Sequence, residues 1–277
     1  MTTTIRPTEP LQQGADGAKS RTYDVCVNSR RVGRIRIATD ARFGAAVGRI
    51  DGLWIDEADR GRGRGTVAAL AAEEVLRGWG CGQVTLSVPA DADAALRMAG
   101  ALGYVERSRN MVKQLPPTAP ELPAGTAGRP MRADEFEVWE RADAESFARS
   151  WIERGVPEAQ ARARAAGEHR RLLPDGLATA GARFLVLEDR GSPVGSVWVG
   201  RSPVPAEGAY VFDVRVAPEH RGRGHGRSLM LLAQGVALAD GADTLALHVF
   251  AGNTPALRLY ESLGYRPTRY HQYKSLL

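Results

Sequence analysis

The chain has 277 residues, a formal net charge of +5 and an apolar fraction of 43%, values that are typical of a folded globular protein and exclude wholesale disorder. At about 100–200 residues per domain, this length allows one large domain or two modest ones. All but three of the 37 basic residues are arginines, the exceptions being Lys19, Lys113 and Lys274. An excess of arginine over lysine arises from GC-rich coding DNA or from binding of a polyanionic ligand. The positions of the arginines distinguish these two explanations.

Cysteines and histidines are too few and too scattered for a disulfide framework or a metal centre. Cys26 and Cys81 do not have metal-binding spacing, and no pair among the five histidines follows the pattern HxxxH. We therefore expect no metal. The chain does not open with the apolar segment of a signal peptide, and no apolar run approaches the ~18 residues of a membrane-spanning helix. We expect a cytoplasmic location and no membrane partner.

Residues 1–20 are polar and contain glycine, and we expect them to be poorly ordered or to form a first strand. The segment from 21 to 115 then predicts a regular series of elements. These are strands over 23–27, 31–37 and 50–55, a helix over 66–79, a strand over 84–88, a helix over 94–101 and a final strand region. Gly80 follows the longer helix, where a terminating glycine is common.

Five prolines between residues 116 and 130 predict an extended, semi-rigid linker. After this linker, residues 134–172 fit two amphipathic helices broken near Gly155 and Pro157. The segment before the linker contains no counterpart of these two helices.

The remaining part of the chain repeats the first part. Three sequence pairs show this: Arg60-Gly61-Arg62-Gly63 with Arg221-Gly222-Arg223-Gly224, Leu102-Gly103-Tyr104 with Leu263-Gly264-Tyr265, and Val32-Gly33 with Val194-Gly195. The offset is 161 residues for the first two pairs and 162 for the third. Two copies of about 90 residues indicate a tandem duplication rather than a solenoid. We expect a reduced N-terminal domain over 21–115 and a complete C-terminal domain over 131–277.

A glycine-rich segment over 216–228 joins a predicted strand to a predicted helix in the second copy. Backbone N–H groups at successive glycines and at a helix N-terminus converge on an anion, which suits a pyrophosphate. The segment is neither a Walker loop nor a dinucleotide fingerprint, because both need a glycine where Arg227 stands. A tight turn without any ligand is the alternative interpretation.

The pattern Arg221-x-x-Gly224-x-Gly226 resembles the Q/R-x-x-G-x-G/A acyl-CoA loop of the Gcn5-related N-acetyltransferases. The V-x-V-A-P-E-H run before it and the N-x-x-A-x-x-L-Y-E-S-L-G-Y run from Asn253 to Tyr265 are similar to that family as well. The resemblance covers 131–277 fully and 22–115 in part. It implies an α/β (α+β) fold of two tandem copies, each a mixed, splayed, mostly antiparallel sheet flanked by helices, with the N-terminal copy reduced.

The resemblance also implies that acetyl-CoA is the co-substrate and that its acetyl group passes directly to an amine. The pantetheine arm would pair with the backbone of one strand, and the pyrophosphate would lie on the glycine-rich loop. The implied CoA-binding residues are Val214, Val216, Arg221, Gly222, Arg223, Gly224, His225, Gly226, Arg227, Ser228 and Asn253. Asn253 also suits the cap of the following helix.

Transfer to an amine calls for a base, because an amine with a pKa near 10 is mostly protonated at neutral pH, and for an acid at the departing thiolate. The resemblance gives Tyr260 the acid role, with simple packing of its helix as the alternative. His248 is a candidate base, because ribosomal-protein N-terminal acetyltransferases carry a catalytic Glu at that spacing; a structural strand histidine is the alternative. Asp213 is a further candidate, although Phe212 replaces the first acid of the pair in polyamine-type members and Asp213 could simply pair with Arg215.

The first copy lacks these groups, since Ala99, Ala92 and Ser87 stand in the positions of Tyr260, Asn253 and His248. We therefore expect the N-terminal domain to be non-catalytic, whether it still binds CoA or only packs on the C-terminal domain. The leading function is N-acetylation of a small-molecule amine or a peptide N-terminus by the C-terminal domain. The alternative is an acyl-CoA-binding regulatory or structural protein with little transferase activity.

The arginines favour coenzyme A over nucleic acid as the polyanion. They lie largely in the two glycine-rich loops and on helix surfaces, and they form no basic stripe interleaved with aromatic residues. We expect no nucleic-acid partner. The oligomeric state is open, with a homodimer among the options.

Overall fold

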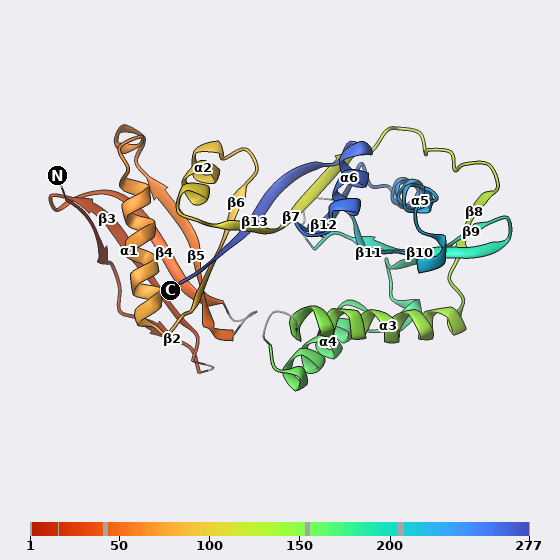
Figure 1. Cartoon of the computed structure of the whole chain (residues 1–277), viewed down its shortest axis with the longest axis horizontal. Coiled ribbons are helices and arrows are strands. Elements are labelled where there is room, and N and C mark those ends of the chain that lie inside the picture. Colours follow the sequence, from red (N-terminus) through yellow and green to blue (C-terminus); the bar gives the residue numbers. More distant parts are fainter. Residues whose placement is uncertain (1, 16, 41–43, 153–155, 204–207, 277) are drawn as a thin grey trace. The chain divides into compact units, whose positions relative to one another are not determined.

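Two units make up the chain in a computed structural model that describes residues 2–15, 17–40, 44–152, 156–203 and 208–276. Met1–Arg109 and Thr268–Leu277 form the first unit, and Asn110–Pro267 forms the second. Each unit contains a mixed, mostly antiparallel sheet with helices packed on it, as Figure 1 shows. The predicted class of fold is confirmed.

The sheet of the first unit has the strand order β1-β3-β4-β5-β6-β13. The strands are β1 (Thr3–Pro7), β2 (Gln12–Gln13, paired with β3), β3 (Lys19–Val27), β4 (Arg30–Asp40), β5 (Gly44–Ile55), β6 (Gln83–Pro89) and β13 (Arg266–Ser275). Helix α1 (Arg64–Gly78) packs Ala68, Ala72 and Leu76 into the core of this unit, and α2 (Asp93–Ala101) adds Ala99. The first twenty residues contain β1, which pairs antiparallel with β3, so they are part of this sheet.

The sheet of the second unit has the strand order β7-β12-β11-β10-β9-β8. The strands are β7 (Val105–Gln114), β8 (Thr126–Pro130), β9 (Arg183–Asp189), β10 (Ser192–Arg201), β11 (Ala209–Val216) and β12 (Thr244–Phe250). Strand β8, at the end of the predicted linker, pairs with β9. In Figure 1, α3 (Ala133–Ile152) and α4 (Glu158–Leu172) lie on one side of β10 and β11, and α5 (His225–Ala239) and α6 (Thr254–Ser262) lie on the other.

The structure contains both helices expected over 134–172. Pro157 directly precedes α4, which agrees with the expected break between the helices near this proline. Gly155, the other residue expected at the break, lies outside the described residues. Helix α1 begins two residues earlier than the sequence predicts, directly after Gly63, and α5 begins directly after Gly224. Each of these glycines has a left-handed backbone that sets the entry to the helix.

Both sheets open at the same relative position. The parallel pairing of β5 with β6 ends at Ile50↔Leu86, and that of β11 with β12 ends at Val211↔Leu247. These positions are equivalent in the two copies, so the predicted splay is present in each. A bulge follows directly, since Trp198 pairs with Asp213 and Val199 with Val211, which leaves Phe212 as the extra residue.

The two copies differ in the sheet face that α3 and α4 cover in the second unit. There, Phe184, Trp198 and Phe212 pack with Phe136 and Trp139 of α3. The equivalent positions of the first copy hold Thr22, Arg36 and Asp51. The carboxylate of Asp51 lies 2.6 Å from Arg49 and 3.9 Å from Arg36, and the side chain of Arg36 is 57% exposed. An antiparallel sheet tolerates such a charged face toward water, so this copy does not require the two helices.

The last strands of the two copies are exchanged between the units. Strand β13, from the second copy, pairs with β6 of the first unit, whereas β7, from the first copy, contributes Asn110 onward to the second unit beside β12. Equivalent contacts follow this exchange. Lys274 Nζ donates to Glu73 Oε2 at 2.7 Å, and Lys113 Nζ donates to Gln234 Oε1 at 2.8 Å, with each partner 161 residues from its counterpart. The sequence predicted domains over 21–115 and 131–277. The two units differ from these ranges because residues 110–115 belong to the second unit and residues 268–277 to the first.

The exchange predicts unequal effects for two equivalent lysines. Lys274→Met leaves the buried carboxylate of Glu73 without its ammonium partner, and we expect it to lower the free energy of unfolding by about 3 kcal/mol. Lys113→Met removes a partner only from the neutral amide of Gln234, and about 1 kcal/mol is expected. Urea unfolding of both variants measures the difference, and a larger loss in Lys113→Met would contradict the exchange.

Candidate active site

The loop between β11 and α5 is shaped to bind an anion. Gly222 and Gly224 have φ angles of +77° and +86°, a region that glycine adopts without strain. Arg227 N and Ser228 N in the first turn of α5 donate to Gly224 O, and the helix dipole adds partial positive charge at this end. Three exposed arginines stand in this segment, namely Arg221, Arg223 and Arg227. The loop therefore has the backbone and the charge that a pyrophosphate needs.

Several predicted CoA-binding side chains have partners within the protein. Arg221 Nε donates to the carbonyl oxygen of Val216 at 3.3 Å, and Arg227 Nη2 donates to Ser262 Oγ at 2.6 Å. His225 and Ser228 are buried, so only their backbone groups face the loop.

Two further predicted residues serve the helices near the loop. A β-carbon at Gly226 would lie 3.2 Å from Leu259 Cδ2, so this glycine lets α5 approach α6 closely. Asn253 caps α6, where its Oδ1 accepts from Ala256 N at 3.3 Å. The capping alternative is thus the role seen for this side chain.

One edge of β11 is open where the sheet splays. Val214 and Val216 pair with Val197 and Gly195 of β10, whereas the pairing with β12 ends at Val211. Unpaired backbone groups favour a partner that can complete the ladder. An extended ligand with its own amide groups suits this edge, which leads directly to the glycine-rich loop.

Asp213 lies on β11 two residues beyond the last pairing with β12, and its charge acts on the buried Tyr260 of α6. Trp139 Nε1 donates to Asp213 Oδ2 at 3.0 Å, and Arg215 Nη2 lies 3.6 Å from the same oxygen. Burial raises the pKa of Asp213, while the guanidinium of Arg215 opposes the rise. Burial also raises the pKa of Tyr260 to about 12, with a further contribution from the charge of Asp213. Tyr260 therefore keeps its proton at neutral pH, and Asp213 is a stronger base than an exposed aspartate.

His248, the other candidate base, is exposed on β12. Its Nδ1 lies 2.9 Å from Asn110 Oδ1, and its ring contacts Phe250 edge to face at 5.3 Å. It points away from the face that packs Leu247 and Val249 into the core, because successive strand residues alternate between faces. The exchanged strand β7 supplies the asparagine that holds this histidine.

Sequence reasoning missed a network that extends from Asp213 to α4. Arg215 Nη2 donates to Asp143 Oδ1 at 3.1 Å, and His169 Nε2 lies 2.8 Å from Asp143 Oδ2. The hydrogen bond with Asp143 raises the pKa of His169, with burial opposing it. Trp139 and Asp143 are four residues apart on α3 and so share a face, a signal in the sequence that could have paired them.

The first copy keeps the loop but differs in what surrounds it. Gly61 and Gly63 have φ angles of +70° and +71°. Arg64, in the position of His225, forms a buried ion pair with Asp59, which also lies 2.8 Å from Arg30. The loop conformation is therefore retained while the side chains that accompany it have changed.

Among the described residues, no helix is both long enough and apolar enough to span a bilayer. Among the same residues, no group of three or more His, Cys, Asp or Glu side chains is arranged to hold a metal ion.

Comparison with known proteins identifies the family. The family model described as "Acetyltransferase (GNAT) family" matches residues 4–104 and 136–265. The chain belongs to the GNAT acetyltransferase family. Members of this family use acetyl-CoA as co-substrate, and the chain is accordingly an N-acetyltransferase.

Relatives with this GNAT fold include both named and uncharacterized proteins. A mycothiol acetyltransferase from Thermobispora bispora is 36% identical over 220 residues, which cover 74% of this chain and 68% of the relative. The uncharacterized N-acetyltransferase YdgE from Bacillus subtilis is 28% identical over 149 residues, 53% of this chain and 95% of the relative.

Two solved structures share the fold at lower identity. A GCN5-related N-acetyltransferase from Sphaerobacter thermophilus has a TM-score of 0.59 at 23% identity, covering 92% of this chain and 80% of that one. A tandem GNAT protein from the clavulanic acid biosynthesis pathway has a TM-score of 0.52 at 20% identity, covering 95% and 85%. The second match confirms the tandem arrangement of the fold.

The raised pKa of His169 predicts a pH-dependent contribution to stability. The Asp143–His169 interaction is fully present below the usual histidine pKa of about 6.5 and is lost as pH rises through the raised value. His169→Gln should therefore reduce the free energy of unfolding more at about pH 5.5 than at about pH 8.5. Urea unfolding at both pH values measures this. In an Asp143→Asn background the difference should shrink. An equal loss at both pH values in the chain that keeps Asp143 would refute the assignment.

Proposed function

We propose that the C-terminal domain transfers an acetyl group from acetyl-CoA to a primary amine, on a small molecule or a peptide N-terminus, and that the N-terminal domain does not catalyse. The observation that supports this most is the open edge of β11, which carries Asp213 and leads to the glycine-rich loop, together with the buried Tyr260 on α6. The first copy has Ala99 in place of Tyr260, so it lacks this pair.

Acetyl-CoA supplies an acetyl thioester, whose C–S bond breaks as the amine nitrogen forms the new amide bond. The N–H groups from Gly222 to Gly226 bind its pyrophosphate, since those of Arg227 and Ser228 already donate to Gly224 O. Arg221, Arg223 and Arg227 balance the charge. The backbone of Val214 and Val216 pairs with the pantetheine arm along the open strand edge. This scheme needs no covalent intermediate on the enzyme.

Three proton transfers accompany the reaction. Tyr260 donates its phenolic proton to the departing CoA thiolate, since its raised pKa keeps that proton available across the neutral range. The phenolate of Tyr260 is then reprotonated by the further proton that the attacking nitrogen releases as the amide forms. Asp213 attracts the ammonium form of the acceptor and takes its proton before attack. Trp139 and Arg215 hold the Oδ2 atom of Asp213 and so fix the direction of this carboxylate. His248 is the alternative base.

Enzyme assays with a panel of amines identify the acceptor. The relatives named mycothiol acetyltransferase make the amine acceptor of that reaction a first substrate to test. Other primary amines and peptide N-termini complete the panel, with free thiol release from acetyl-CoA as the readout.

Tyr260→Phe removes the proposed acid with little change in volume. We expect kcat to fall about a hundredfold or more, the scale of a lost general acid, while the KM for acetyl-CoA changes little. The matched control is Tyr265→Phe, a buried tyrosine whose ring lies 5.9 Å from that of Tyr260. A wild-type kcat in Tyr260→Phe would exclude the acid role.

The same assay separates the two candidate bases. If Asp213 is the base, Asp213→Asn removes the acidic limb of the kcat/KM profile, and His248→Gln preserves it. The reverse pattern would give the role to His248.

Equivalent glycines test which copy binds the co-substrate. Gly224→Ala places a side chain at a φ of +86°, which costs roughly 1–2 kcal/mol of backbone strain, although no atom lies within 4 Å of the new carbon. We expect the KM for acetyl-CoA to rise about tenfold or more, because the loop amides turn away from the pyrophosphate. Gly63→Ala imposes the same strain on the first loop and should leave that KM unchanged. If only Gly63→Ala raises the KM, the roles of the two copies are reversed.

A further inference from the structure

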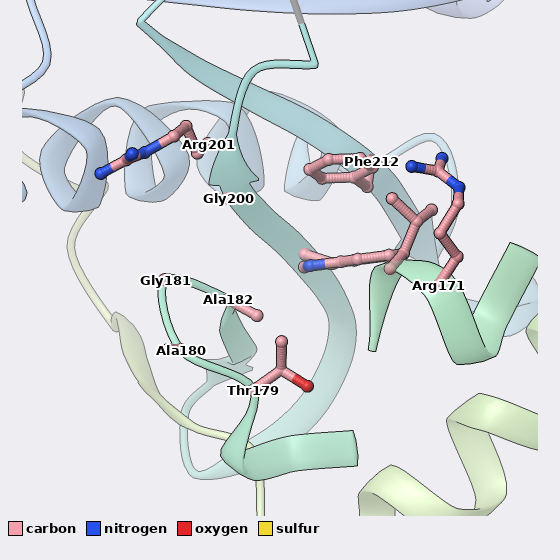
Figure 2. Close-up of a pocket in the computed structure, with 10 residues that line it drawn as sticks. Arg171, Thr179, Ala180, Gly181, Ala182, Gly200, Arg201 and Phe212 are labelled. Atoms are coloured by element: carbon pink, nitrogen blue, oxygen red, sulfur yellow. The ribbon is translucent and has the colours of Figure 1, made fainter. Parts of the chain in front are cut away.

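A cavity in the second unit adjoins the residues proposed for catalysis. Its volume is about 480 Å³, within the range of pockets that hold small organic ligands. Its walls come from the end of α4, the turn over 179–182, the end of β10 and Phe212 of β11 (Figure 2). Gly200 keeps part of this space open, since a β-carbon there would lie 3.1 Å from the Phe212 ring.

Asp213 does not line the cavity, but it directly follows Phe212, which does. The Cα atoms of these two residues lie about 3.8 Å apart. Trp139 joins the two regions as well, because it donates to Asp213 and also contacts the ring of Trp198 at 5.6 Å. An amine bound at Asp213 would therefore have the remainder of its molecule within reach of the cavity.

The lining combines a flat apolar wall with a buried donor that has no partner. Trp198 stacks on Phe212 with 4.4 Å between ring centroids and 19° between planes. Trp198 is 5% exposed, and its Nε1–H donates to no atom among the described residues. That nitrogen is also closed to solvent, so a ligand in the cavity meets Trp198 through the carbon atoms of its ring.

The charged side chains of the lining are all cationic. Arg171 and Arg201 belong to it, and no Asp or Glu does. Arg171 also pairs with Glu168 on its own helix, and its head lies near Phe212 in Figure 2, whereas Arg201 extends in the other direction. These groups favour an anionic end on the ligand, opposite to the amine that Asp213 attracts.

We infer that this cavity receives the non-reacting part of the acceptor, an apolar ring or chain that ends in a carboxylate. The inference rests on the proposed function, because it takes the amine to be bound at Asp213. It narrows the acceptor to amines with a negative group at the far end.

The probe is 4-(aminomethyl)benzoate, which carries an amine and a carboxylate on opposite ends of one ring, with 4-(aminomethyl)benzamide as its uncharged counterpart. Titration calorimetry on the full chain measures binding of each. We expect the carboxylate to bind about tenfold tighter than the amide, the scale of one charge-assisted hydrogen bond. Equal affinities, or no binding of either probe, would overturn the proposal.

Variants connect this binding to the cavity. Arg171→Gln combined with Arg201→Gln should remove the preference for the carboxylate, and Arg170→Gln, an exposed neighbour outside the lining, should retain it. Ala180→Phe adds bulk at an exposed lining position and should weaken both probes about tenfold while the fold is kept, as circular dichroism checks. Unchanged binding in Ala180→Phe would place the probes elsewhere and refute the cavity.

Thiol release distinguishes this inference from the proposed function. If the binding pattern holds but no amine releases thiol from acetyl-CoA, the cavity stands and the proposed function fails. If amines without a carboxylate are acetylated equally well in wild type and Ala180→Phe, the function stands and the cavity proposal fails.

Discussion

The open edge of β11 is the constraint around which the second unit is arranged. Backbone N–H and C=O groups in a folded protein need partners, and the loss of β12 after Val211 leaves a row of them for a ligand to complete. The bulge at Phe212 comes directly at this point and lets Phe212 and Asp213 both contact the aromatic and charged groups near α3. The glycine-rich loop and the N-terminus of α5 continue the same edge. In the proposed function, acetyl-CoA completes this open part of the sheet.

The two copies show what a sheet face requires when its helices are lost. In the second unit, α3 and α4 cover an aromatic face built on Phe184, Trp198 and Phe212. The first copy carries Thr22, Arg36 and Asp51 there, and its paired charges face water. Exposed ion pairs contribute little to stability, so these residues mainly keep the uncovered face compatible with solvent. The first copy thus has charged residues where the second has aromatic ones, and it also lacks the two helices. Without the aromatic residues, this face of the first copy has no apolar cluster for such helices to cover.

Local patterns were sufficient to predict the elements and the loop. Glycines with left-handed backbones and helical periodicity act over a few residues, so helices α1 to α6 followed from the sequence. The tandem arrangement followed from the 161-residue repeat, and the splay from the resemblance to the Gcn5-related N-acetyltransferases. The exchange of the last strands did not, because Lys113 and Lys274 are identical residues at equivalent positions and either pairing satisfies the same pattern. The contacts of Asp213 were also out of reach. They join Trp139 and Asp143 to a strand about 70 residues away, and no motif connects the two segments.

The exchange of strands also sets the order in which the chain becomes complete during translation. Strand β13 leaves the ribosome after nearly every residue of the second unit, yet it belongs to the sheet of the first. Until residues 268–275 emerge, β6 lacks this neighbour, and an unpaired strand edge is a site for wrong pairing. The unit that is encoded first is thus finished last, and a nascent chain that stalls before residue 268 holds an incomplete first unit even when the second has folded.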